Sequence, residues 1–103
     1  METFVSVAKV GDIPPGAGKQ FKIGKTLISL WNLDGAIYAI NDTCTHEEEY
    51  LSEGELVDGC CVECAAHGAV FDLRTGAVKA LPATEPVQTY TVRIEGDDIQ
   101  VAV

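Results

Sequence analysis

Short runs in which apolar and polar residues alternate make up most of this chain, and turn-forming residues separate them. Between residues 88 and 94, Tyr90, Val92 and Ile94 fall on one face and threonine and arginine side chains on the other. Because side chains of a strand point alternately to its two faces, this period indicates strands that are half-buried. The pattern predicts strands over residues 3–10, 19–23, 26–33, 36–40, 70–72, 88–94 and 99–103.

The turn signals support the same interpretation. Asp34-Gly35 lies between two strand-like runs and predicts a two-residue hairpin turn. The chain has 10 glycines and 4 prolines, and no stretch has the spacing of a long amphipathic helix. We find no internal repeat or linker. The sequence therefore predicts one all-β domain over residues 1–103, a small antiparallel β-sandwich or barrel.

Composition and charge narrow the classes of function. Hydrophobic residues make up 47% of the 103 residues, which suits a globular domain with a single core. The 16 acidic residues outnumber the 7 basic ones and give a formal charge of −9, which argues against binding nucleic acid or an anionic membrane. The chain contains neither a signal-peptide pattern nor an apolar run long enough for a transmembrane helix. We expect a cytoplasmic protein.

The four cysteines lie close to both histidines of the chain. Cys44, Cys60, Cys61 and Cys64 occupy a stretch of 21 residues, with His46 inside it and His67 just beyond. A secreted disulfide scaffold would require an export signal and a lower apolar content. In a reducing compartment, cysteines clustered with histidines more often bind a metal.

Two cysteine–histidine pairs have the spacing of metal ligands. Cys44-Thr45-His46 and Cys64-Ala65-Ala66-His67 each offer one thiolate and one imidazole from a single loop, and Gly68 follows the second pair. Two such loops could hold a tetrahedral structural zinc. They could equally hold a two-iron cluster, with both cysteines on one iron and both histidines on the other. The spacing alone leaves these alternatives open.

The motif as a whole resembles the Rieske iron–sulfur family. Cys-X-His and Cys-X-X-His-Gly are followed by Phe71-Asp72-Leu73-Arg74-Thr75-Gly76, similar to the family's continuation, and residues 80–83 resemble its third, proline-containing loop. The resemblance implies a cluster-binding subdomain with loops at about residues 42–50, 64–70 and 80–86. It also implies one 2Fe-2S cluster held by Cys44, His46, Cys64 and His67. One departure is Ala65, where the family usually has proline.

Length and strand rhythm are similar to the small Rieske ferredoxins over the whole chain. These proteins carry single electrons in bacterial aromatic-ring-hydroxylating dioxygenase systems. The resemblance implies two partners, an NAD(P)H-dependent flavoprotein ferredoxin reductase and a terminal oxygenase. It implies a monomeric carrier and not an enzyme, because both histidines are committed to the cluster and none remain for the mononuclear iron of an oxygenase.

Within this family, the residues favour the low-potential type. High-potential members carry two further cysteines, at positions that correspond to Glu49 and Ala66 here. They also carry hydroxyl donors where this chain has Ala69 and Phe71. Donors to sulfur stabilise the reduced state, so their absence lowers the potential, and the net charge acts in the same direction.

Two alternatives from other classes remain. A structural zinc-binding β module would use the same four ligands but would be colourless. A protein like the small subunit of nitrite reductases would share the fold, although such subunits typically lack the ligands.

Two further features have no assigned role. We expect Cys61 to be a buried strand residue and Cys60 a partly exposed turn residue, neither of them a metal ligand. Residues 41–63 contain no lysine or arginine, and Glu47, Glu48 and Glu49 directly follow His46. This acidic run is either a docking surface for basic partners or simply a solvated face. Its acids are Asp42, Glu47, Glu48, Glu49, Glu53, Glu55, Asp58 and Glu63.

Overall fold

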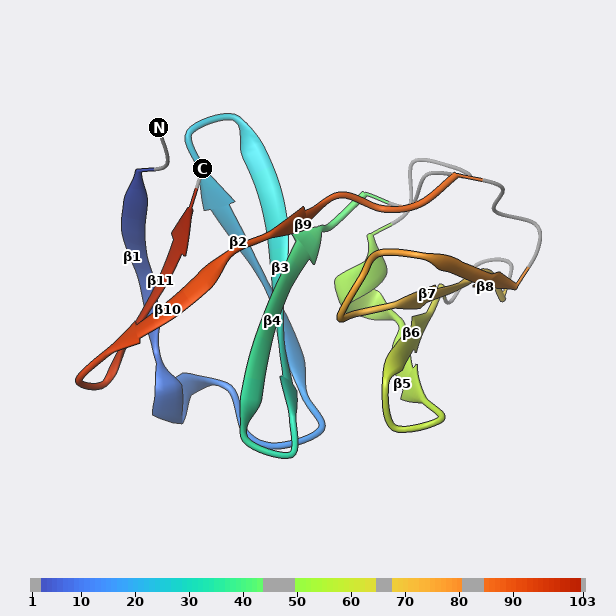
Figure 1. Cartoon of the computed structure of the whole chain (residues 1–103), viewed down its shortest axis with the longest axis horizontal. Coiled ribbons are helices and arrows are strands. Elements are labelled where there is room, and N and C mark those ends of the chain that lie inside the picture. Colours follow the sequence, from blue (N-terminus) through green and yellow to red (C-terminus); the bar gives the residue numbers. More distant parts are fainter. Residues whose placement is uncertain (1–2, 44–49, 65–67, 81–84, 103) are drawn as a thin grey trace.

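The computed structural model describes residues 3–43, 50–64, 68–80 and 85–102, and these form three antiparallel sheets (Figure 1). The first sheet has the order β1-β11-β10, with β1 Phe4–Lys9, β11 Asp98–Ala102 and β10 Val92–Glu95. The second has the order β2-β3-β4-β9, with β2 Gly18–Ile23, β3 Thr26–Leu33, β4 Ala36–Asn41 and β9 Thr89–Tyr90. The third has the order β5-β6-β7-β8, with β5 Glu55–Val57, β6 Cys61–Glu63, β7 Val70–Asp72 and β8 Val78–Ala80. Two short 3-10 turns complete the described elements, η1 Val10–Asp12 and η2 Leu51–Glu53.

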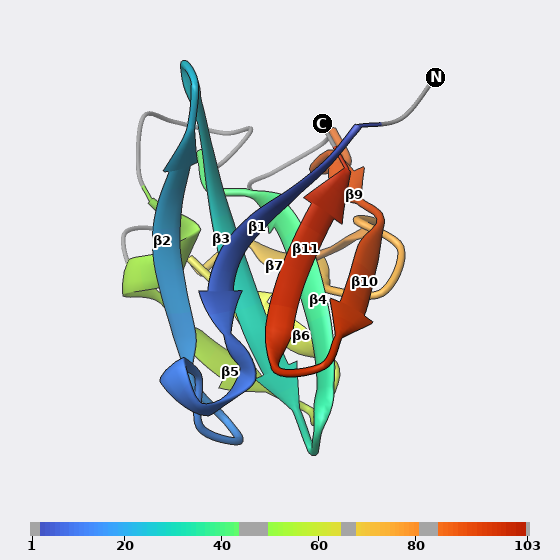
Figure 2. The same cartoon turned by 90° about the vertical axis from the view of Figure 1, so that its left-hand side faces the viewer.

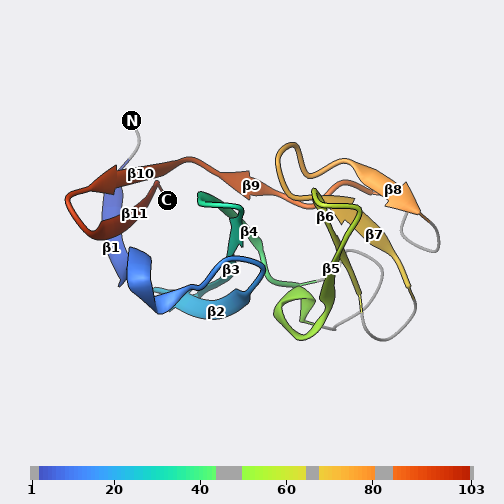
Figure 3. The same ribbon diagram turned by 90° about the horizontal axis from the view of Figure 1, so that it is seen from below.

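The first two sheets face each other and the third lies beside the second. Figure 2 shows β1, β11 and β10 in front of β3 and β4, and Figure 3 shows the third sheet set apart from them. A first core fills the space between the facing sheets. The predicted all-β, antiparallel fold is thus confirmed. Within the described part of the chain, no helix has the length and apolar character needed to cross a bilayer. The buried members of the first core are Ile13, Ile28, Leu30, Ala39, Ile99 and Val101.

Strand β3 is buried on both faces, because it belongs to both cores. Ile28 and Leu30 point into the first core, while Trp31 points the other way into a second core. The Trp31 indole Nε1 donates a hydrogen bond to Ser29 Oγ at 2.9 Å, which satisfies its only polar group. A Cβ at Gly18 would come within 2.5 Å of the Trp31 ring, so this position in β2 requires glycine.

The second core joins the second sheet to the third. It combines residues of β3 and β4 with residues of β6 and β7, and with side chains from the connections between strands. Because it contains Trp31 and Phe71, it buries two of the largest apolar side chains of the protein. Its buried members are Trp31, Ile40, Leu51, Val62, Cys64, Ala69, Phe71, Leu73 and Val87.

Two local predictions had different outcomes. The Asp34-Gly35 turn is confirmed, with φ of 53° and 97°, and it joins β3 to β4 with Leu33 opposite Ala36.

The single strand predicted over residues 88–94 is wrong, because the chain changes sheets within it. β9 pairs with β4 and β10 pairs with β11, so the alternation continues while the neighbouring strand changes. Ile94, near the end of this run, is 46% exposed.

A buried carboxylate fixes the chain just after β4. Asp42 is fully buried, and its Oδ atoms accept hydrogen bonds from Gln20 Nε2 at 2.6 Å, Ser52 N at 2.7 Å and Ser52 Oγ at 2.8 Å. Its backbone N–H donates to Leu27 O at 3.0 Å, and its carbonyl accepts from Leu51 N at 2.7 Å. Asp42 therefore ties the end of β4 to β2, β3 and η2. The prediction that it belongs to a solvated or docking face is wrong, because burial with three donors gives it a structural role.

Replacing Asp42 by asparagine should destabilise the protein. The substitution removes the charge and turns an amide N–H₂ toward groups that are themselves donors, which should cost about 2 kcal/mol or more. For a domain of this size, such a loss lowers Tm by roughly 10 °C. Thermal unfolding followed by circular dichroism would measure this loss. The matched control is Glu55→Gln, at an exposed residue of β5. Equal Tm values for the two variants would contradict this role of Asp42.

Candidate metal centre

Cys64 is the one expected metal ligand that lies among the described residues. Cys44, His46 and His67 lie outside them. Cys64 directly follows β6, and only 2% of it is exposed. Its backbone N–H donates to Ala69 O at 2.7 Å, and its carbonyl accepts from Gly68 N at 3.0 Å. These two bonds tie the chain before residues 65–67 to the chain after them.

Gly68 has a conformation that requires glycine. Its φ is 76°, in the left-handed region that other residues rarely adopt. A Cβ at this position would meet no described atom within 4 Å. The backbone conformation alone therefore accounts for glycine at this position.

The two ends of segment 44–49 are also held together. Thr43 pairs with Tyr50 in an isolated antiparallel bridge. One residue further out on each side, Leu51 N donates to Asp42 O at 2.7 Å. The buried Asp42 network thus closes the base of the segment that contains Cys44 and His46.

The residues on both sides of segment 81–84 are held by the third sheet and by the turn between β7 and β8. Ala80 pairs with Val70 across β8 and β7, and Val87 N donates to Gly76 O at 2.9 Å. Gly76 has a φ of 79°, and a Cβ there would lie 2.1 Å from Val87 O. This close approach of two backbones explains the glycine that ends the Phe-Asp-X-X-Thr-Gly sequence.

The second core brings the flanks of all three segments together. Leu51 follows the first segment, Cys64 and Ala69 flank the second, and Val87 follows the third, and all four side chains are buried in that core. The three stretches implicated by the sequence therefore start and end around one apolar centre. A buried cysteine in this setting, with one further cysteine and two histidines on the adjoining segments, is a donor set that fits a 2Fe-2S cluster with mixed ligation.

The residues that follow the second segment supply no side-chain donors to this centre. Ala69 and Phe71 are both fully buried in the second core with Cys64. Neither side chain can donate a hydrogen bond. This burial agrees with the expectation that sulfur atoms here lack the hydroxyl donors of the high-potential proteins.

An ion pair fixes the turn between β7 and β8. Asp72 Oδ1 accepts from Arg74 N at 2.8 Å and Arg74 Nε at 3.2 Å, and Asp72 Oδ2 accepts from Arg74 Nη2 at 3.0 Å. The hydrogen bonds from the Arg74 side chain hold the pKa of the Asp72 carboxyl below its usual value. The carboxylate is therefore ionised at neutral pH and orients the chain that leads from Phe71 into the turn.

The predicted burial of Cys61 and partial exposure of Cys60 are confirmed, but their pairing is new. Cys61 is buried at the start of β6, and Cys60 is partly exposed just before it. The structure joins their sulfur atoms in a disulfide, with the Asp72 carboxylate close to both. Adjacent cysteines in the sequence were the only signal that could have suggested this bond.

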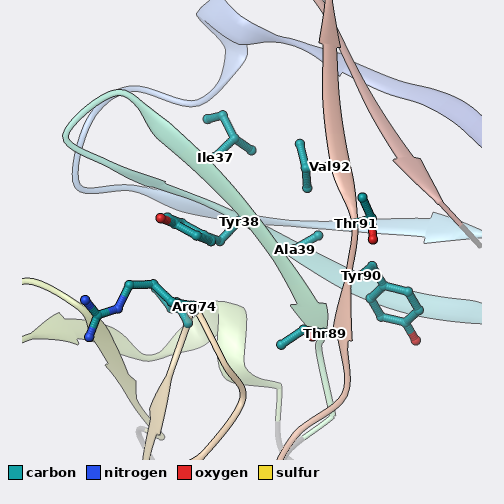
Figure 4. Close-up of a pocket in the computed structure, with 9 residues that line it drawn as sticks. Ile37, Tyr38, Ala39, Arg74, Thr89, Tyr90, Thr91 and Val92 are labelled. Carbon is teal, nitrogen blue, oxygen red and sulfur yellow. The ribbon is translucent and has the colours of Figure 1, made fainter.

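A pocket of about 330 Å³ lies where β4, β9 and β10 meet the turn after β7 (Figure 4). Tyr38 and Arg74 extend to one side of it and the Tyr90 ring to the other. No carboxylate, histidine or cysteine is among the residues that line it. Its lining consists of Ile37, Tyr38, Ala39, Leu73, Arg74, Thr89, Tyr90, Thr91 and Val92.

Comparison with known proteins agrees with this arrangement. Residues 3–91 match the family model of the Rieske [2Fe-2S] domain. The biphenyl dioxygenase ferredoxin subunit of Pseudomonas sp. strain KKS102 is 42% identical over 99 residues, which cover 96% of this chain and 91% of that protein.

Two solved structures share the fold over nearly the whole chain. The ferredoxin of carbazole 1,9a-dioxygenase from Nocardioides aromaticivorans IC177 has a TM-score of 0.91 and 35% identity, covering 96% of both chains. A second carbazole 1,9a-dioxygenase structure, a complex of reduced oxygenase and oxidized ferredoxin, matches with a TM-score of 0.89 and 32% identity, covering 96% of this chain and 92% of that one. With its all-β fold and the flanks of its cysteine–histidine segments gathered around one core, this chain belongs to the Rieske [2Fe-2S] family and is a ferredoxin-type electron carrier that binds one 2Fe-2S cluster.

Proposed function

We propose that this protein is a low-potential Rieske ferredoxin that carries single electrons from an NAD(P)H-dependent flavoprotein reductase to a terminal aromatic-ring oxygenase. The observation that carries this proposal is the likeness to dioxygenase ferredoxins over 96% of the chain. One of the matching structures is a complex of such a ferredoxin with its oxygenase. Family and relatives favour this function over a zinc module or a nitrite reductase small subunit.

Four residues would hold the cluster, within loops at about residues 42–50, 64–70 and 80–86 of a single domain. Cys44 and Cys64 would bind one iron, and His46 and His67 the other. When bound, the cluster supplies reversible one-electron transfer. The second core keeps water from the Cys64 side of the centre, while the Asp42 network and the Gly68 turn hold the ends of two ligand segments. The protein itself needs no proton donor or nucleophile.

Iron, sulfide and spectroscopic analysis would test the four ligands. The purified protein should be red-brown and contain two iron and two sulfide per chain, with a Rieske-type electron paramagnetic resonance signal when reduced. Cys64→Ser should lose the cluster, whereas Cys60→Ser, which changes a nearby cysteine outside the motif, should retain it. Stoichiometric zinc without visible absorption would instead support the structural zinc module.

The midpoint potential should lie at or below about −150 mV, the lower end of the Rieske range. The reason is the absence of donors at Ala69 and Phe71, which are buried beside Cys64. Phe71→Tyr or Ala69→Ser should raise the potential by roughly tens of millivolts where the new hydroxyl reaches a sulfur. Redox titration would measure this. Phe21→Tyr, on strand β2 beside the first core, serves as the control. A wild-type value well above zero would refute the donor argument.

We further propose that the acidic run beside the first segment steers basic partners. Glu53, Glu55, Asp58 and Glu63 are exposed on η2, on β5, in the turn that follows it and on β6. Glu47, Glu48 and Glu49 lie outside the described residues but adjoin these in sequence. Surface charges act chiefly on association rate and are screened over about 8 Å at physiological salt.

Turnover with limiting ferredoxin should therefore decline as ionic strength rises. Charge reversal at Glu47, Glu48 and Glu49 should lower the rate further at low salt without loss of cluster. Reduction by the reductase and oxidation by the oxygenase would be measured separately by stopped flow. A triple lysine variant at Asp97, Asp98 and Glu95, far from this run in sequence, is the control. If charge reversal at Glu47, Glu48 and Glu49 left both electron-transfer rates unchanged, the acidic run would be a solvated face without a role in docking.

A further inference from the structure

Cys60 and Cys61 form a chemical group that the cluster does not use. The four cluster ligands come from other positions, and Cys60 and Cys61 are joined to each other. Cys61 lies opposite Asp72 in the pairing of β6 with β7, and Leu73 N donates to Cys60 O at 3.0 Å. The backbone on both sides of the pair is therefore held by the sheet.

The pair is separate from Cys64, the proposed cluster ligand that directly follows the same strand. Val62 and Cys64 belong to the second core, whereas Cys61 is not among its members. Successive residues of a strand point to opposite faces, so Cys61 faces away from the core that holds Cys64. Three residues of strand also separate their backbones by about 10 Å. Chemistry at the pair can thus proceed without breaking a bond to iron.

The bond is not a structural staple. Disulfides stabilise proteins chiefly by closing long loops of the unfolded chain. Cys60 and Cys61 are neighbours in the sequence, so their bond closes no such loop. In a reducing compartment, disulfides of this kind are usually transient and act in catalysis or redox sensing.

A metal ion at the same place is less well supported. Cys60, Cys61 and Asp72 have ligand atoms within 4.8 Å of one another. However, the Asp72 carboxylate already accepts three hydrogen bonds from Arg74, which occupy both of its oxygens. Two sulfur atoms with an engaged carboxylate fit a disulfide better than a three-ligand metal site.

We propose that Cys60 and Cys61 form a reversible thiol–disulfide site that exchanges with low-molecular-weight disulfides of the glutathione type. The difference in exposure assigns the roles, because Cys60 is partly exposed and Cys61 is buried. The Cys60 thiolate attacks the external disulfide, forms a mixed disulfide and releases one thiol. Cys61 then attacks Cys60 Sγ and releases the second thiol. The protein dithiol loses two electrons and two protons, and the external disulfide takes up both to give two thiols.

Thiol labelling and mass spectrometry of the holoprotein would test this exchange. Protein reduced with dithiothreitol and desalted should take up N-ethylmaleimide on Cys60 and, on unfolding, on Cys61. After incubation with oxidised glutathione, the peptide that contains both should be unlabelled and lighter by two hydrogen atoms. The Cys60→Ser/Cys61→Ser double variant gives the background from Cys44 and Cys64.

Single variants separate the two roles. Cys61→Ser, or Cys61→Ala where serine impairs folding, should accumulate a stable glutathione adduct on Cys60, because nothing displaces it. Cys60→Ser should form this adduct at least tenfold more slowly, because Cys61 is buried. The visible spectrum of the cluster should stay unchanged throughout, so that the result does not depend on the proposed electron-transfer function.

Two results would overturn the proposal. One is wild-type protein that still labels on both cysteines, or that keeps a glutathione on Cys60, after the incubation. The other is equal adduct formation in the Cys60→Ser and Cys61→Ser variants, which would remove the assigned roles of attacking and resolving cysteine.

Discussion

Burial of the second face of β3 is the constraint on which the rest of this structure depends. One face of this strand packs in the sandwich, and the other presents Trp31 to the third sheet. The third sheet has only three-residue strands, which would be too short to be stable alone. Packing against Trp31 and Ile40 gives it a core, and that core also contains Cys64. The same apolar contact therefore holds the subdomain in place and sets the surroundings of Cys64, the ligand proposed for the cluster.

Two aspartates then fix the connections that apolar packing leaves undefined. Asp42 binds the chain on both sides of the first ligand segment, and Asp72 orients the turn between β7 and β8 through Arg74. Although the protein is acidic, these two carboxylates are buried and bound by hydrogen bonds, unlike the acids on its surface. Their oxygens accept hydrogen bonds that a neutral side chain of similar size could not all accept. Glu53 and Glu55, by contrast, are exposed, as the proposed steering of partners requires.

Strand β6 and the residues that flank it carry both of the proposed sulfur sites. Alternation places Val62 and Cys64 toward the second core and Cys61 toward the other face. Cys64 therefore lies in the apolar second core, and Cys61 belongs to a partly exposed pair with Cys60. Because the two proposed sites face opposite sides of the strand, thiol–disulfide exchange at the pair need not involve the cluster, although only two residues lie between Cys61 and Cys64.

The sequence by itself determined the strands with clear alternation, the Asp34-Gly35 hairpin and the cysteine–histidine motif, because these depend on neighbours within a few residues. Only the tertiary structure decided which sheet each strand joins, since β9 and β10 form one alternating run but pair with different partners. It also decided that Asp42 is buried and that the sulfurs of Cys60 and Cys61 meet. The alternation along the chain carries no signal for the burial of Asp42, because the donors that satisfy it come from residues 20 and 52, which are not its neighbours in the sequence.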